Sequence, residues 1–152
     1  MATPVRPVSL RHPSVVIDAS VWASWYMHWD RNHAASVDWM SKFIDAGGLL
    51  IAPTLLLIEV AAAIARQSGP AAIARQAAQS LQNVSEMRLI PLDATLVQES
   101  IDVAADLSLR AGDAVYVAVA QRMSIPLVSW DRQQLQRAST AVATCTPDTF
   151  PF

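Results

Sequence analysis

Five short apolar runs alternate along the chain with longer stretches that have helical periodicity. We expect these runs to be strands, and they cover residues 14–18, 49–52, 88–92, 126–129 and 142–144. Apolar side chains follow one another in the runs instead of alternating with polar ones, which is typical of strands buried on both faces. The pattern therefore predicts an α/β protein of three layers, with a parallel central sheet between two layers of helices.

The segments between these runs predict the helices. We expect helices from residue 20 onward, over 33–46, 55–67, 70–84 and 113–123, and after residues 93 and 131. Ser20, Thr54 and Asp93 are the predicted N-caps, because their side-chain oxygens can accept a hydrogen bond from the first turn. Gly47 and Gly48 end the second helix, and Pro70 fits the first turn of the fourth.

The stretch 47–65 is apolar enough to resemble a membrane span, but two residues argue against that reading. Pro53 breaks the run, and Glu59 places a charge in its second half. We therefore expect a buried strand followed by a buried helix, and no contact with a membrane.

Composition and length fit one globular domain. The chain has 152 residues, of which 53% are hydrophobic and 16% charged, so it is neither disordered nor too short to bury a core. We expect residues 14–152 to form a single domain and the proline-rich residues 1–13 to be a loose arm without the apolar segment of a secretory signal. Cys145 is the only cysteine, which rules out an internal disulfide and suggests a cytoplasmic protein.

Four carboxylates stand in apolar surroundings. Asp18 and Asp131 follow predicted strands one and four, Glu59 lies inside an apolar helix, and Asp113 is the only charge between residues 111 and 120. Each aspartate alone could be a helix cap or a turn residue, but four buried acids are costly without partners, and Lys42 is the only lysine. Strand ends meet at one edge of a parallel sheet, so the set is typical of a site for Mg²⁺ or Mn²⁺.

These residues resemble the four acidic motifs of the PIN-domain ribonucleases and, more narrowly, of the VapC-type toxins of toxin–antitoxin pairs. Asp18 and Ser20 stand in VIDASV, Glu59 in PTLLLIEV, Asp113 in AGDAVYVAVA and Asp131 in LVSWD. The resemblance covers about residues 14–148 and implies a sheet of order 3-2-1-4-5. The chain differs at residue 129, where Ser replaces the usual Thr, and in the tryptophan that follows.

The resemblance also implies an activity, namely hydrolysis of RNA phosphodiester bonds by an endoribonuclease that depends on divalent metal. The four acids would hold one or two Mg²⁺ or Mn²⁺ ions, and Ser20 and Ser129 would hydrogen-bond a carboxylate or a metal-bound water. The implied partners are RNA, a small antitoxin protein and a second copy of the chain. Arg110, Arg132 and Arg137 lie near the last two motifs and would line a path for phosphates, unless they are ordinary surface residues.

The net charge is −2, whereas nucleic-acid binders are usually basic, but without the four acids the remainder is +2. The charge of the chain is therefore compatible with a nucleic-acid substrate.

Two alternative functions stay open. One is a PIN-type RNA-processing or DNA-cleaving nuclease without an antitoxin, and the other is a PIN-fold binding module without catalysis. Phosphoryl transfer through an aspartyl phosphate intermediate is excluded, because that chemistry needs a lysine after a late strand and Lys42 is the only lysine. Trp22, Trp25 and Trp29 are predicted to share one helix face. Together with Trp39 they are expected to belong to the core, with a base-stacking platform or a self-association surface as the alternatives.

Overall fold

A computed structural model describes residues 12–152, apart from the side chain of Ser68. Its centre is a parallel sheet of five strands in the order β3-β2-β1-β4-β5, which confirms the predicted order. In register, Val16 of β1 pairs with Ile51 of β2 on one side and with Leu127 of β4 on the other. The strands are β1 (Ser14–Ile17), β2 (Leu49–Pro53), β3 (Met87–Ile90), β4 (Leu127–Val128) and β5 (Thr144–Cys145).

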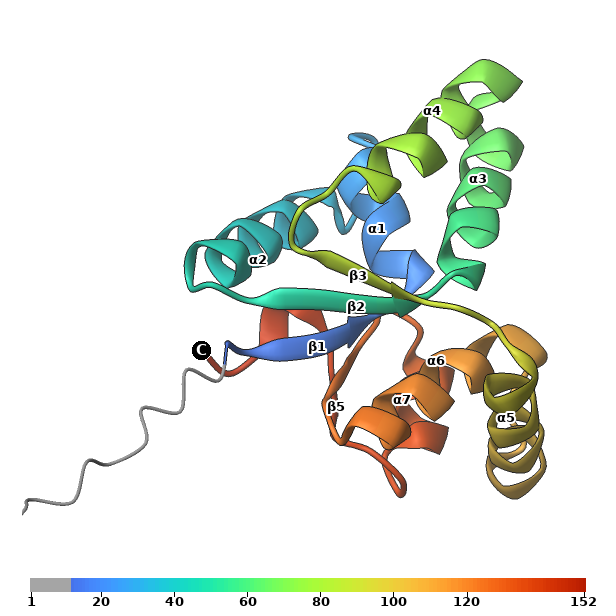
Figure 1. The fold of residues 1–152 in the computed structure, drawn as a ribbon. Coiled ribbons are helices and arrows are strands. Elements are labelled where there is room, and N and C mark those ends of the chain that lie inside the picture. Colours follow the sequence, from blue (N-terminus) through green and yellow to red (C-terminus); the bar gives the residue numbers. More distant parts are fainter. Residues whose placement is uncertain (1–11) are drawn as a thin grey trace, which may run out of the picture.

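Helices cover both faces of this sheet, as the alternating pattern predicted (Figure 1). One layer, above the sheet in Figure 1, contains α1 (Ala19–Tyr26), α2 (His33–Asp45), α3 (Leu55–Ser68) and α4 (Ala71–Gln82). The layer below it contains α5 (Ala94–Leu107), α6 (Ala111–Met123) and α7 (Arg132–Ala138). A short 3₁₀ helix, η1 (Pro147–Thr149), follows β5.

Helix α6 is the most deeply buried helix of the lower layer. It packs against β1, β2 and β4, and α5 covers its other side. All seven residues from Ala114 to Ala120 are therefore buried, including Tyr116, whose side chain is fully enclosed. Burying a side chain of this size stabilises the fold by about 1.5–3 kcal/mol, so α6 fixes the first turn that carries Asp113.

Two predictions about helix α1 are wrong. Its N-cap is Asp18 and not Ser20, because Asp18 has extended backbone angles and its carboxylate accepts the Ser20 N–H at 2.9 Å. The helix also ends at Tyr26, so Trp29 lies beyond it and does not share a helix face with Trp22 and Trp25.

The other predicted caps have mixed outcomes. Asp93 caps α5 by accepting the Leu96 N–H, as predicted. Thr54 precedes α3 but makes no cap bond, because its hydroxyl accepts the Leu92 N–H instead. Helix α6 begins at Ala111, which places Asp113 inside the first turn. The aspartate is therefore free to project from the helix.

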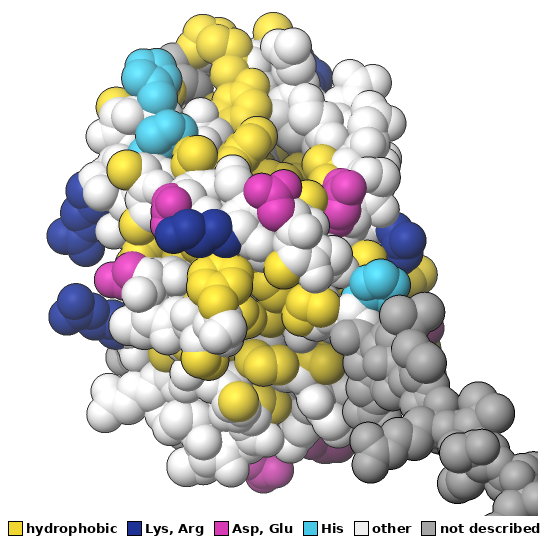
Figure 2. All heavy atoms as spheres, turned by 90° about the vertical axis from the view of Figure 1, so that its left-hand side faces the viewer, with side chains coloured by type: hydrophobic (Ala, Val, Ile, Leu, Met, Phe, Trp, Pro, Cys, Tyr) yellow, Lys and Arg dark blue, Asp and Glu magenta, His cyan; other side chains and the backbone are white. Residues whose placement is uncertain are grey.

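The tryptophans are divided between core and surface. Trp22 and Trp39 are buried, whereas Trp25 and Trp29 are 37% and 54% exposed. Trp22 and Trp25 of α1 line a groove together with Met40 and Ile44 of α2 and with Val84, which follows α4. Most of the residues that line the groove are apolar, and Ser41 and Asp45 complete the lining. On the face shown in Figure 2, hydrophobic side chains run down the middle of both the upper and the lower half.

The apolar stretch 47–65 folds as expected into β2 and most of α3. None of the described helices has the length and the apolar character needed to cross a membrane. The predicted arm, residues 1–13, lies outside the described residues up to residue 11. Pro13 is described, and its carbonyl accepts the Leu49 N–H at the start of β2.

Candidate functional site

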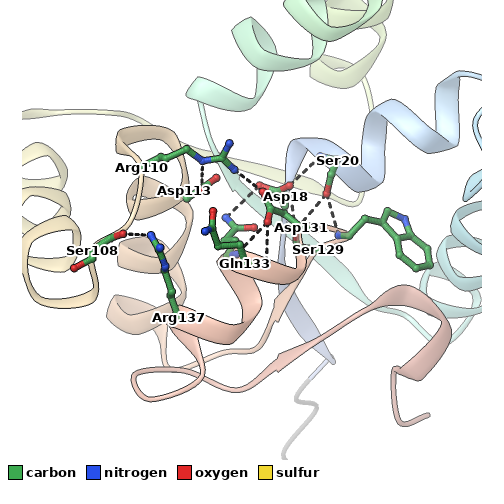
Figure 3. Close-up of polar contacts among 11 residues, drawn as sticks. Asp18, Ser20, Ser108, Arg110, Asp113, Ser129, Asp131, Gln133 and Arg137 are labelled. Atoms are coloured by element: carbon green, nitrogen blue, oxygen red, sulfur yellow. Dashed lines mark hydrogen bonds and ion pairs between the residues drawn. The ribbon is translucent and has the colours of Figure 1, made fainter.

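Four carboxylates from four different elements gather at the carboxyl-terminal edge of the sheet. Asp18 follows β1, Asp131 follows β4, Glu59 projects from α3, and Asp113 projects from the first turn of α6. Asp18, Glu59 and Asp113 line one cavity of about 300 Å³ together with Ser20. Asp131 lies at its side, where it is joined to Asp113 by a shared ion-pair partner (Figure 3).

Asp18 is almost completely buried, at 6% exposure, and is held by three hydrogen-bond donors. Its Oδ2 atom accepts the Ser20 N–H at 2.9 Å and the Ser129 hydroxyl at 3.2 Å. Its Oδ1 atom accepts the side-chain amide of the buried Gln134 at 3.3 Å. Asp18 therefore caps α1, and the three donors also fix the position of its carboxylate at the site.

The two predicted serines connect the ends of β1 and β4. Their hydroxyl oxygens lie 3.3 Å apart, and each accepts a backbone N–H from the loop after β4. Ser20 accepts from Trp130 at 3.0 Å, and Ser129 accepts from Asp131 at 2.9 Å. Of the two hydroxyls, only that of Ser129 also contacts a site carboxylate, that of Asp18. The serines therefore fix the distance between the strand ends that carry the two aspartates.

Glu59 lies half-buried between α3 and α6. The Tyr116 hydroxyl donates to its Oε2 atom at 2.6 Å. Burial raises the pKa of Glu59, and the charges of Asp18 and Asp113 raise it further, while Tyr116 and Arg110 act in the opposite direction. Burial and the two neighbouring acids therefore disfavour the charged form of Glu59.

Gly112 allows α6 to approach Glu59 closely. A Cβ atom at this position would stand 2.5 Å from Oε1 of Glu59, which is shorter than real carbon–oxygen contacts. Only a residue without a side chain leaves the carboxylate in its present place, so the glycine of the AGDAV segment has a steric role in the site.

Arg110 joins the remaining two acids. Its Nε atom donates to Oδ2 of Asp113 at 2.9 Å, and its Nη2 atom donates to Oδ2 of Asp131 at 2.5 Å. Burial nevertheless raises the pKa of Asp113, and the Arg110 guanidinium only partly offsets this. The expectation of an acidic cluster without a basic partner is therefore wrong for Asp113 and Asp131, because Arg110 stands one helical turn before Asp113 and within reach of it.

Asp131 has a second role as the N-cap of α7. Its Oδ1 atom accepts the backbone N–H groups of Gln133 and Gln134 at 3.0 and 3.1 Å. The cap uses one carboxylate oxygen and leaves Oδ2 to Arg110. The carboxylate is thus oriented by the helix on one side and by an arginine on the other.

The predicted phosphate-binding arginines have different places. Arg110 is at the acids, whereas Arg137 donates to the carbonyl of Ser108 and points away from them in Figure 3. Arg132 is the exposed first residue of α7. The structure therefore brings one of the three arginines into contact with the site carboxylates.

Sequence reasoning missed several residues of the site. Arg66 is exposed and lines the same cavity as Asp18 and Glu59, and its spacing of seven residues from Glu59, two helical turns, was a usable signal. Tyr116 and Gly112 stand in the third motif, but no pattern in the chain showed that they contact Glu59. Gln134 gave no signal, because its contact with Asp18 depends on the packing of α7.

The fit of a divalent cation depends on the donors that these residues offer. Among residues 12–152, no three carboxylate, imidazole or thiol side chains form a cluster that could hold a metal as they now stand. The acids are instead directed at protein donors, namely Ser20, Ser129, Tyr116 and Arg110. The donor set still fits Mg²⁺ or Mn²⁺, because carboxylate oxygens are the ligands that hard cations require. The four acids also lie close together, since the charges of their neighbours help to raise the pKa of Glu59 and of Asp113.

Comparison with known proteins agrees with this architecture. A search among curated protein sequences finds no match. Among solved structures, the Mycobacterium tuberculosis toxin VapC20, described as cleaving the sarcin-ricin loop, has a TM-score of 0.69 at 17% identity, over 90% of this chain and 99% of its own. The Pyrobaculum aerophilum protein PAE2754 has a TM-score of 0.64 at 22% identity, over 90% of this chain and 92% of its own.

A toxin–antitoxin complex from Klebsiella pneumoniae contains a similar chain, with a TM-score of 0.62 at 13% identity, over 88% of this chain and 97% of that one. At these identities the likeness concerns the fold. The sequence profile of the PIN domain, in contrast, matches residues 15–140, which include all four acids and the whole sheet except Ser14 and β5. With this match and the 3-2-1-4-5 sheet, the chain belongs to the PIN-domain family.

Proposed function

We propose that the protein is an endoribonuclease that uses Mg²⁺ or Mn²⁺ and acts as the toxin of a toxin–antitoxin pair. One observation carries the proposal: four carboxylates from β1, α3, α6 and the loop after β4 gather at one edge of the sheet, beside a cavity of about 300 Å³. A structural role for all four is unsatisfactory, because burial and mutual repulsion raise the pKa of Glu59 and Asp113 at the expense of stability.

Hydrolysis of a phosphodiester adds water to phosphorus and releases the 3′ oxygen of the ribose. A divalent ion, when bound, lowers the pKa of water and stabilises the charge that develops on the phosphoryl oxygens. Asp18 and Asp131 are oriented for binding such an ion by Ser129, Gln134 and the first turn of α7.

Glu59 is suited to handle a proton at its Oε1 atom. Tyr116 binds the Oε2 atom and fixes the carboxylate, while Oε1 receives no hydrogen bond from the described residues. The pKa of Glu59 is raised above its ordinary value by burial, which brings it nearer to the pH at which a general base is effective. Glu59 can therefore ligate the cation or accept a proton from water at this atom.

Two arginines on the rim of the cavity support a nucleic-acid substrate. Arg66 lines the cavity beside Glu59, and Arg110 stands beside Asp113 and Asp131. Arginine binds phosphate with two parallel hydrogen bonds, so the pair can hold the backbone on both sides of the cut. RNA is favoured as the substrate because the four acids stand in motifs that resemble those of ribonucleases, and because the similar VapC20 is described as a toxin that cleaves the sarcin-ricin loop.

An antitoxin and a second copy of the chain are the proposed protein partners. The fold is shared with the toxin–antitoxin complex from Klebsiella pneumoniae. The apolar groove that contains Trp22, Trp25, Met40 and Ile44 offers a surface that a partner helix could cover.

A cleavage assay on structured RNA tests the activity. Wild type, Asp18→Asn and the control Asp38→Asn would be compared with Mg²⁺, with Mn²⁺ and with EDTA. Asp38 is exposed on α2 and pairs with Lys42, outside the cavity. We expect metal-dependent cleavage by wild type and the control, and a loss of at least a hundredfold in Asp18→Asn, on the order of the effect of removing a charge-stabilising group. Cleavage in EDTA, or near-wild-type activity of Asp18→Asn, would contradict the proposal.

A further inference from the structure

Arg110 is attached to the site by the two acids alone. Its guanidinium bridges Asp113 and Asp131 in Figure 3, and its side chain is 66% exposed to solvent. Among the described residues, no other side chain or carbonyl accepts a hydrogen bond from it. The guanidinium is thus held in the site by charge and not by packing.

Arg110 occupies carboxylate oxygens that a cation could otherwise bind. Both bonds end on Oδ2 atoms, one from each aspartate. For Asp131 this is the last available oxygen, because its Oδ1 atom already accepts two backbone N–H groups of α7. A guanidinium and a divalent ion on this oxygen oppose each other's binding, since both are positive and would be within contact distance of each other.

We infer that Arg110 is a built-in counter-ion, which occupies the Asp113 and Asp131 carboxylates in the metal-free protein and is displaced when a divalent cation binds there. The released guanidinium then remains at the rim of the cavity, where it can bind a phosphate of the RNA. This inference rests on the proposed function and adds a competition between one residue of the chain and the metal.

Displacement of Arg110 requires little free energy. Exposed ion pairs contribute only a small stabilisation, and Arg110 belongs to the backbone turn before α6 and not to the helix itself. Arg122 provides the contrast, because it pairs with Glu99 between α6 and α5, away from the four acids. The ion pair between Arg122 and Glu99 therefore does not compete with a cation at the four acids.

The competition has a consequence for the order of binding. A phosphate that binds Arg110 withdraws it from the aspartates, and an ion that binds the aspartates releases Arg110 for the phosphate. Each ligand therefore favours the other, and by linkage the effect is reciprocal. The empty protein would bind metal weakly and bind it more tightly when RNA is present.

Calorimetric titration with Mn²⁺ alone tests the inference on the full chain. Wild type, Arg110→Gln and the control Arg122→Gln would be compared at low ionic strength. We expect Arg110→Gln to bind Mn²⁺ roughly three- to tenfold more tightly than wild type, because two exposed ion pairs no longer oppose the ion. Arg122→Gln should bind like wild type. Equal or weaker binding by Arg110→Gln would overturn the inference.

A second measurement follows Arg110 in the wild-type chain. In an NMR titration with Mg²⁺, the Nε–H signal of Arg110 should shift as the ion pairs break, while that of Arg122 stays in place. A fixed Arg110 signal in the presence of Mg²⁺ binding would overturn the inference and leave the proposed function standing. Failure of all three proteins to bind Mn²⁺ would contradict both.

Discussion

At the scale of single residues, the site carboxylates are held by hydrogen bonds and are also closely surrounded by backbone. Glu59 shows this most clearly, because Tyr116 holds one of its oxygens while α6 approaches the other at Gly112. Gly112 is not in the left-handed region of backbone angles, so its role is to leave space and not to allow a turn. A side chain introduced at residue 112 would therefore disturb the Glu59 carboxylate without straining the backbone of the fold.

Gly112→Ala should therefore reduce activity without destabilising the protein. The new Cβ would push the end of a flexible glutamate side chain, which can move, and alanine favours a helix over glycine by up to about 1 kcal/mol. We expect RNA cleavage to fall at least tenfold while the melting temperature stays equal to that of wild type or rises. Full activity in this variant would show that the position of the Glu59 carboxylate does not matter for cleavage.

The raised pKa of Glu59 predicts how stability depends on pH. Because burial raises this pKa, the folded chain holds the proton more tightly than the unfolded chain, and stability is lost as the pH rises from the ordinary value of 4.5 through the raised one. Glu59→Gln removes this loss, and Tyr116 can donate to the new amide oxygen.

We therefore expect Glu59→Gln to melt about 2 °C above wild type at pH 7 and to lose this advantage near pH 4. Thermal melts at the two pH values check the expectation, with Glu86→Gln in the turn before β3 as the control. A variant that melts below wild type at pH 7 would show that the carboxylate stabilises the fold.

At the scale of the elements, a network of hydrogen bonds connects the loop after β4 to helices α1 and α2. The Trp130 indole N–H donates to the Ser36 hydroxyl at 2.8 Å, and the hydroxyls of Ser36 and Ser24 lie 2.7 Å apart. Trp130 thus joins α2 to the loop that carries Asp131, which gives the unusual tryptophan of the fourth motif a structural role.

Ser36→Ala tests this connection. The variant leaves the Trp130 N–H without its acceptor beside a fully buried position, and we expect a loss of about 1–3 kcal/mol in the free energy of unfolding. Denaturant unfolding would measure it against Ser80→Ala, whose exposed hydroxyl bonds only a carbonyl of its own helix. Equal stability of the two variants would mean that Trp130 does not depend on Ser36.

The strands, their order and the Asp93 cap were predictable, whereas the caps of α1 and α3 and the side-chain contacts of the site were not. Apolar runs such as residues 49–52 mark buried strands, and the resemblance supplied the order that places Asp18 and Asp131 on neighbouring strand ends. The choice of Asp18 over Ser20 as the cap depends on the backbone angles of one residue. The bridge from Arg110 to Asp131 spans 21 residues, and chain periodicity carries no information about such a contact.

At the scale of the whole molecule, the net charge conceals a separation of charge at the site. The total is −2, and four acids at one sheet edge account for more than all of it, so the remaining surface is slightly basic. Arg66 on α3 and Arg110 before α6 are the arginines beside the acidic cavity. The phosphate backbone of a nucleic acid is attracted to these two arginines, and it is repelled by the acids between them until a cation is bound.

Arg66 is accordingly the residue whose loss should weaken RNA binding without affecting the metal. It lines the cavity with Asp18 and Glu59 but forms no ion pair with either among the described residues. We expect Arg66→Gln to bind RNA roughly five- to tenfold more weakly, with a salt dependence smaller by about one phosphate contact and with unchanged affinity for Mn²⁺. Titrations of RNA at several salt concentrations, with Arg122→Gln as the control, measure both quantities. If Arg66→Gln changed Mn²⁺ affinity as much as RNA affinity, Arg66 would act on the carboxylates and not on the phosphate, and the RNA path would have to cross the cavity elsewhere.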